Sequence, residues 1–157
     1  METSPTKAVQ TRATFHQSCA IACTIQASPD RIWSLLTRAE DIPRWNSTVT
    51  SISGPIALGK KLALKVPAAE RTFTPRVTRF EEGKAMEWSD GMAPMFKGIR
   101  TFTLTPKADG ATEFAMNEEL SGLMLPIIKG SLPDFAPVFE AYAEDLKRAA
   151  EGGRRES

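Results

Sequence analysis

The chain contains few of the residue types that build metal centres, disulfide frameworks or nucleophilic active sites. Its 157 residues include two cysteines, one histidine and one tyrosine: Cys19, Cys23, His16 and Tyr142. Residues four apart on a strand lie about 13 Å from each other, which is too far for a disulfide. We therefore expect both cysteines to be small buried hydrophobes. The single histidine leaves no Ser-His-Asp or Cys-His set and no zinc site at familiar spacings.

The chain also lacks a strong net charge and any long apolar run. Its formal net charge of +1 gives no argument for nucleic acid or for an anionic membrane. No run approaches the roughly 20 apolar residues of a membrane helix, and Gly-rich nucleotide loops are missing. The polar start has no apolar signal-peptide core. We expect a cytoplasmic protein, monomeric or homodimeric, with no cofactor, no nucleic-acid partner and no stable membrane insertion.

The length predicts one domain, because 157 residues can bury a sizeable core without a second one. We expect residues 14–151 to form this domain. The polar composition of residues 1–13 predicts a disordered or loosely attached tail, and residues 152–157 are expected to fray.

Local patterns predict the elements of the first two thirds of the chain. Apolar residues at alternate positions predict a half-buried strand over Phe15–Ala27. Ser28-Pro29-Asp30 is a helix start, since Ser caps well and Pro fits the first helical position. The further expected elements are helices over Pro29–Thr37 and Ala39–Trp45, short strands in Ser47–Ser53 and Lys60–Val66, and a hairpin of Glu70–Phe80 with Lys84–Asp90.

The most regular pattern is a hairpin over Gly98–Ser121. Lys107-Ala108-Asp109-Gly110 has turn chemistry. A turn centred on Asp109 predicts the cross-strand pairs Leu104 with Phe114, Phe102 with Met116, and Arg100 with Glu118. One apolar face thus ends in opposed charges, which is typical of a sheet that lines a mostly apolar pocket.

The preceding hairpin extends this face. Around Glu82-Gly83, the expected pairs are Val77 with Trp88 and Arg79 with Met86. A symmetric connection over Gly91–Lys97 sets Trp88 beside Arg100, so Trp88, Arg100 and Glu118 form one row. The apolar residues expected around this row are Phe73, Val77, Met86, Phe102 and Met116.

The last part of the chain predicts a long helix with a broken start. Apolar side chains recur at helical spacing in Leu123–Ala150, at Ile128, Leu132, Phe135, Phe139, Tyr142 and Leu146. Three prolines cannot all lie in an undisturbed helix. We therefore expect a break over Pro126–Asp134 and a regular helix from Phe135. A curved antiparallel sheet around this helix would leave a cavity between the two.

Four segments resemble the START-like, helix-grip superfamily, in its polyketide cyclase/dehydrase and lipid-transport branch. They are ASPDRIWSLL at 27–36, DIPRW at 41–45, FEEGKAMEW at 80–88 and EELSG at 118–122. The resemblance spans roughly residues 15–151. It implies an α+β fold in which about seven antiparallel strands curve around a long C-terminal helix, with two short helices after the first strand.

The leading functional hypothesis is a binding protein for a small hydrophobic molecule, such as a lipid, a polyketide-like compound or an aromatic compound. Trp88, Arg100 and Glu118 would orient the polar end of the ligand, and Met95 lies in the connection at the pocket mouth. The expected ligand contacts are Phe73, Val77, Met86, Trp88, Met95, Arg100, Phe102, Phe114, Met116, Glu118, Ile128, Leu132, Phe135, Phe139 and Tyr142.

Three alternatives stay open at this stage. Arg100 and Glu118 could be a plain cross-strand ion pair. The resemblance also allows a cyclase or dehydratase without metal or nucleotide cofactor, with Glu118 as base and Arg100 steadying an enolate. Finally, the superfamily includes activators of chaperone ATPases, so a protein-interaction module is possible on the same fold.

Overall fold

The computed structural model describes residues 6–152 except 68, 129, 131 and 133. The strands are β1 (Val9–Arg12), β2 (His16–Ile25), β3 (Ser51–Ser53), β4 (Ala63–Lys65), β5 (Thr72–Phe73), β6 (Arg76–Glu81), β7 (Ala85–Met92), β8 (Phe96–Pro106) and β9 (Thr112–Ser121). The helices are α1 (Pro29–Thr37), α2 (Ile42–Trp45), α3 (Leu125–Ile128) and α4 (Phe135–Gly152), with 3₁₀ turns η1 (Ala39–Asp41) and η2 (Ala108–Gly110).

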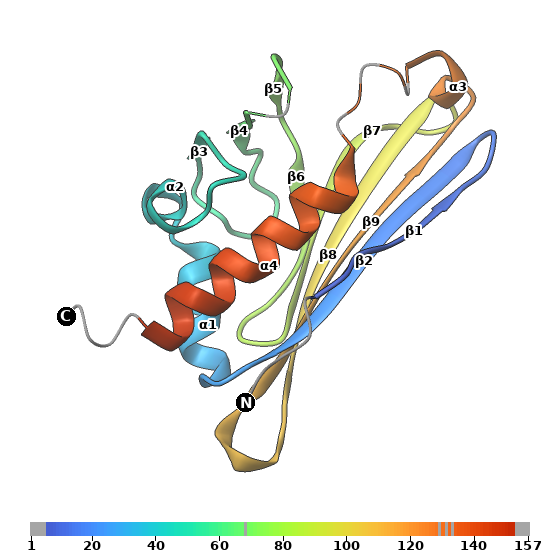
Figure 1. The fold of residues 1–157 in the computed structure, drawn as a ribbon. Coiled ribbons are helices and arrows are strands. Elements are labelled where there is room, and N and C mark those ends of the chain that lie inside the picture. Colours follow the sequence, from blue (N-terminus) through green and yellow to red (C-terminus); the bar gives the residue numbers. More distant parts are fainter. Residues whose placement is uncertain (1–5, 68, 129, 131, 133, 153–157) are drawn as a thin grey trace.

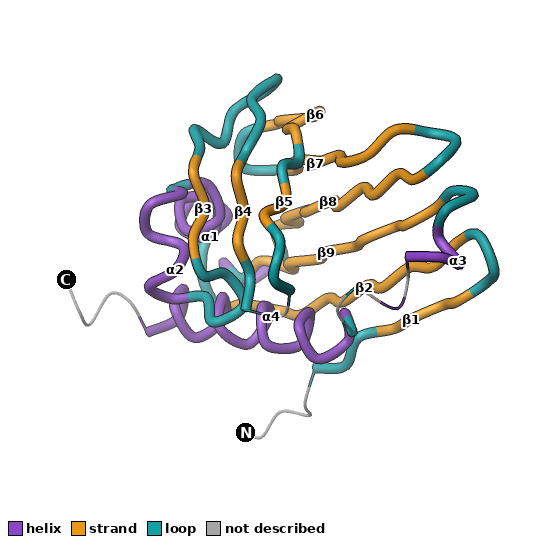
Figure 2. The backbone as a smooth tube through the Cα atoms, turned by 90° about the horizontal axis from the view of Figure 1, so that it is seen from above, coloured by secondary structure: helices purple, strands orange, loops and turns teal. Residues whose placement is uncertain are grey.

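The strands form two sheets of unequal size. The larger is a six-stranded antiparallel sheet of order β1-β2-β9-β8-β7-β6, and the smaller has the order β3-β4-β5. In Figures 1 and 2, α4 and the smaller sheet lie on the same side of the larger sheet, with α1 and α2 beside α4. This arrangement confirms the predicted helix-grip architecture, with the strands divided between two sheets.

Helix α1 begins and ends where its sequence predicts. The Ser28 side chain accepts a hydrogen bond from the Arg31 amide at 3.2 Å, and Pro29 occupies the first turn. The Arg31 guanidinium donates to the carbonyls of Ala149 and Ala150 near the end of α4. Since those carbonyls lack partners within the helix, Arg31 both caps α4 and fixes α1 against it.

The register of the central hairpin is confirmed. Strands β8 and β9 pair Arg100 with Glu118, Phe102 with Met116 and Leu104 with Phe114. The turn takes positive φ at both Asp109 (74°) and Gly110 (79°), which Asp tolerates and Gly adopts freely. Val77 faces Trp88, and Trp88 faces Arg100, so the predicted row across β7, β8 and β9 is present.

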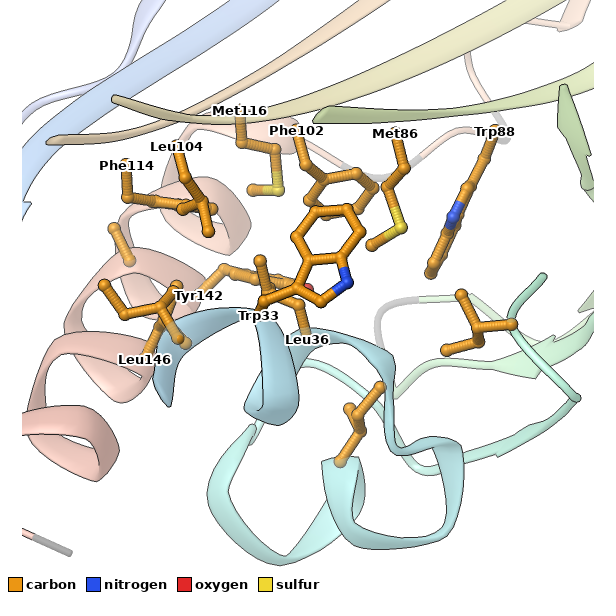
Figure 3. Close-up of a cluster of buried hydrophobic side chains, with 14 of the residues drawn as sticks. Trp33, Leu36, Met86, Trp88, Phe102, Leu104, Phe114, Met116, Tyr142 and Leu146 are labelled. Atoms are coloured by element: carbon orange, nitrogen blue, oxygen red, sulfur yellow. The ribbon is translucent and has the colours of Figure 1, made fainter. Parts of the chain in front are cut away.

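The core fills one half of the space between the larger sheet and the helices. Figure 3 shows Trp33 and Leu36 of α1 facing Met86 and Phe102 of the sheet. These four side chains are buried. Tyr142 of α4 joins the cluster by stacking on Phe114, with ring centroids 6.2 Å apart and planes 4° from parallel. The fully buried large side chains also include Phe139, Met116, Leu146, Ile25 and Ile32.

The described chain ends differ from the expectation at two places. Residues 9–12 form strand β1, paired with Gln17–Ala20 of β2, where a tail was expected over residues 1–13. Three of these four side chains are exposed, so this edge strand lacks the alternation of apolar and polar residues that predicts a strand from sequence. Gly152, expected to fray, is the last residue of α4. Residues 1–5 and 153–157 of the expected tails lie outside the described residues.

The β6–β7 hairpin departs from its expected register through a β-bulge. Arg79 faces Glu87 in place of Met86, and Phe80 faces Met86, because the register shifts between Val77 and Arg79. An extra residue on one strand reverses the alternation beyond it. The Phe80 ring thereby packs against Trp33 of α1, with centroids 5.3 Å apart. Phe73, expected beside the main row, belongs to the smaller sheet.

The broken start of the C-terminal helix is confirmed. Helix α3 ends at Ile128, and α4 begins at Phe135. Pro137 lies in the first turn of α4, where a missing amide hydrogen removes no intrahelical bond.

Phe102→Ala should strongly destabilise the protein, because Phe102 is fully buried and packs on Trp88 with ring centroids 4.9 Å apart. We expect a loss of about 3–5 kcal/mol in the free energy of unfolding, measured by urea denaturation. Thr105→Ala, at an exposed position of the same strand, is the matched control and should cost less than about 1 kcal/mol. Equal effects of the two substitutions would contradict a packed core at Phe102.

The Cys23 thiol should react slowly in the folded protein. Burial raises its pKa to about 11 from 9.0, and the thiolate is the reactive form. At pH 8.5 in a Cys19→Ala background, we expect iodoacetamide to alkylate Cys23 more than about tenfold faster in urea than under native conditions. The raised pKa stabilises the fold below the unfolded pKa, and this stability is lost as the pH rises through 11. Equal native and unfolded rates would contradict this environment.

Candidate functional site

A cavity of about 340 Å³ lies between the two sheets and the C-terminal helices. Its first wall comes from α2, the smaller sheet and the loops around that sheet. The residues are Ile42, Thr48, Val49, Ile52, Leu64, Val66, Arg71, Phe73 and Pro75. The larger sheet contributes Trp88, Asp90, Gly91, Phe96, Gly98, Arg100, Glu118 and Leu120. The C-terminal part closes it with Met124, Ile128, Leu132, Phe135, Val138 and Tyr142. Most of these side chains are apolar.

The cavity brings together eight of the residues predicted from the sequence. They come from the smaller sheet, the central row and the C-terminal stripe: Phe73, Trp88, Arg100, Glu118, Ile128, Leu132, Phe135 and Tyr142. The row therefore shares this space with part of the helix stripe, at Ile128, Leu132, Phe135 and Tyr142.

Seven of the predicted contacts do not line the cavity. Six are core residues, at most 1% exposed: Val77, Met86, Phe102, Phe114, Met116 and Phe139. The space in front of the sheet is not uniformly hollow, because Trp33 and Leu36 of α1 fill it beside Met86 and Phe102. The seventh, Met95, lies between β7 and β8 and is 49% exposed.

The sequence analysis missed much of the opposite wall. Alternating apolar residues over Lys60–Val66 predicted an apolar strand face, but one chain segment does not reveal which element it faces. The missed residues of this wall include Val49, Ile52, Leu64, Val66 and Arg71. The available signal for Arg71 was a basic residue two positions before Phe73, on the same face of an extended chain. Its guanidinium lies 4.6 Å from the Phe73 ring centroid.

Gly98 makes room for the polar end of the cavity. A Cβ atom there would lie 3.1 Å from the Leu120 side chain and 3.6 Å from a carboxylate oxygen of Glu118. A larger residue would therefore press on the floor of the cavity beside the ion pair.

Trp88, Arg100 and Glu118 form the polar row. Arg100 Nε donates to Glu118 Oε1 at 2.6 Å, and the two side chains are only 18% and 15% exposed. The guanidinium also lies 5.1 Å from the Phe139 ring centroid, within the range of a cation–π contact. Each of the two charges therefore has an opposite charge in direct contact, which a largely desolvated ion pair requires.

Several polar atoms of this row have unused hydrogen-bonding capacity. Trp88 Nε1 is buried and has no hydrogen-bond partner in the described chain. Within that part, the only hydrogen bond between side chains of Arg100 and Glu118 uses Nε and Oε1. Burial raises the pKa of Tyr142, with Arg100 opposing the rise, so its hydroxyl stays protonated. A buried N–H without a partner costs about 1–3 kcal/mol.

Two further charged side chains lie on the cavity wall, at its more exposed part. Arg71 is exposed, and Asp90 accepts a hydrogen bond from the Gly91 amide at 2.9 Å. In the described residues, no group of three or more His, Cys, Asp or Glu could hold a metal ion. No helix there is long and apolar enough to cross a membrane.

Solved structures share this fold across nearly the whole chain. A norcoclaurine synthase point mutant from Thalictrum flavum, in complex with a transition-state analogue, has a TM-score of 0.67 at 13% identity, covering 94% of this chain and 100% of that one. A START superfamily protein from Mycobacterium smegmatis has a TM-score of 0.63 at 17% identity, covering 89% and 99%. A conserved protein of unknown function from Enterococcus faecalis has a TM-score of 0.66 at 19% identity, covering 93% and 78%.

At these identities the likeness shows the fold. No curated protein matches the sequence. The family model described as polyketide cyclase/dehydrase and lipid transport matches residues 13–151, which is most of the chain. The chain therefore belongs to the polyketide cyclase/dehydrase and lipid transport family.

Proposed function

We propose that the protein binds one small hydrophobic molecule in the cavity between the two sheets and α4. The observation that carries this proposal is an apolar cavity with a compensated polar row on one wall. Its volume of about 340 Å³ falls within the range of small-molecule pockets, roughly 300–1,000 Å³. The family description, with both cyclases and lipid transport, supports a ligand of this kind.

The candidate ligands are lipids, polyketide-like compounds and aromatic compounds. A norcoclaurine synthase structure with this fold holds dopamine and hydroxybenzaldehyde, which supports the aromatic class. The cavity wall contains Phe73, Phe96, Phe135 and Trp88, whose rings offer faces and edges for aromatic packing.

Apolar burial would supply most of the affinity. Each Å² of apolar surface removed from water contributes about 25 cal/mol before the cost of ordering the ligand and the side chains. The contribution of the polar row is orientation, since Arg100 and Glu118 bring hydrogen-bonding groups to a cavity whose lining is mostly apolar. The ligand's polar end would lie at this row, and its apolar body would extend towards Leu64 and Val138.

A large side chain placed in the cavity should block binding without unfolding the protein. Val138→Trp adds an indole at a half-buried cavity position of α4. We expect it to weaken binding of the neutral fluorescent probe N-phenyl-1-naphthylamine at least about tenfold, because filling the cavity removes apolar contacts. Probe fluorescence gives the affinity, and circular dichroism checks the fold.

Glu144→Trp is the matched control, since it adds the same side chain at an exposed position of the same helix. Its probe affinity should equal that of the unmodified protein. Equal binding by the folded Val138→Trp variant would move the ligand out of the cavity. No binding by the unmodified protein would count against the proposed function.

A further inference from the structure

The charges at the polar row cancel before any ligand arrives. Arg100 and Glu118 are bonded at 2.6 Å with side chains that are mostly desolvated. Phe139 adds a ring face to the guanidinium, and the described residues give neither charge a second ion-pair partner. An additional charge placed beside this pair would therefore enter a poorly solvated space without a counter-charge of its own. Burying an unpaired charge costs far more than burying a hydrogen-bonded neutral group.

The same row offers both donors and an acceptor. The two terminal nitrogens of Arg100 are donors, because its bond to Glu118 uses Nε. Glu118 Oε2 has no hydrogen-bond partner among the described side chains and can accept. Trp88 also lines the cavity, but its Nε1 has less than 1 Å² of accessible surface and does not face a ligand there. A group that accepts from Arg100 and donates to Glu118 would satisfy the atoms that the cavity exposes.

We propose that the polar row selects ligands with an uncharged head that both accepts and donates hydrogen bonds, such as a phenol or a hydroxylated carbonyl compound, over carboxylates and ammonium groups. This inference rests on the proposed function, since it names the chemical class that the same cavity takes. Arg100 and Glu118 are the residues that set the preference.

The alternatives are disfavoured for opposite reasons. A carboxylate would gain donors from Arg100 but would lie against the Glu118 carboxylate. An ammonium group would gain Glu118 but would lie against the Arg100 guanidinium. Arg71 and Asp90 carry opposite charges and both line the cavity, so together they give neither kind of ion a net advantage.

Three probes with one apolar body test the inference: 2-naphthol, 2-naphthoate and 2-naphthylmethylammonium. Each is titrated at pH 7 into the full-length protein by calorimetry. We expect 2-naphthol to bind at least about tenfold more tightly than either ion, because only the ions bring an unpaired charge into the cavity. Tighter binding of either ion than of 2-naphthol would overturn the inference while leaving the proposed function in place.

Glu118→Gln sharpens the test because it removes one charge and keeps the shape. Arg100 then lacks its counter-charge, and the preference should switch to 2-naphthoate by at least about tenfold over 2-naphthol. The double variant Arg100→Gln/Glu118→Gln is the matched control, since its row is neutral again and should return to preferring 2-naphthol. Circular dichroism and thermal unfolding confirm that each variant is folded.

The outcomes separate the two proposals. An unchanged probe order in folded Glu118→Gln would show that the ion pair does not set the preference and would overturn the inference alone. Failure of all three probes and of N-phenyl-1-naphthylamine to bind the unmodified protein would overturn the proposed function, and the inference with it.

Discussion

The antiparallel register of β7, β8 and β9 determines both the core and the cavity. Because side chains alternate across a sheet, one register places Trp88, Arg100 and Glu118 in a row and Met86, Phe102 and Met116 in the next row on the same face. A slip of one residue would turn both rows outward and leave the opposite face to meet α4. The pocket chemistry and the packed core are therefore consequences of one pairing.

The two rows differ in what covers them. Helix α1 brings Trp33 and Leu36 over Met86 and Phe102, and this half becomes a dense core (Figure 3). The other half faces the smaller sheet and the start of α4, which stand back far enough to leave about 340 Å³. The packed core under α1 supplies stability that the region around the cavity does not. The fold can therefore contain a cavity and still have a densely packed core.

Sequence reasoning succeeded where local chemistry fixes the geometry. The turn at Asp109 and Gly110 and the alternation on either side determine the β8–β9 pairs, and Ser28 with Pro29 fixes the start of α1. It failed where the docking of elements distant in the sequence decides whether a residue lies in the core or lines the cavity. Phe102 and Phe114 belong to the core because of how α1 and α4 dock, and Leu64 reaches the cavity because of how the smaller sheet docks. The bulge after Val77 had no residue signature, and β1 is too exposed to show alternation.

The most direct test of the central claim is a crystal structure of the protein with 2-naphthol. The account predicts the naphthalene ring inside the cavity, with its hydroxyl within hydrogen-bond distance of Arg100 and Glu118. A cavity closed by protein side chains, or a saturated crystal with 2-naphthol bound elsewhere, would contradict it.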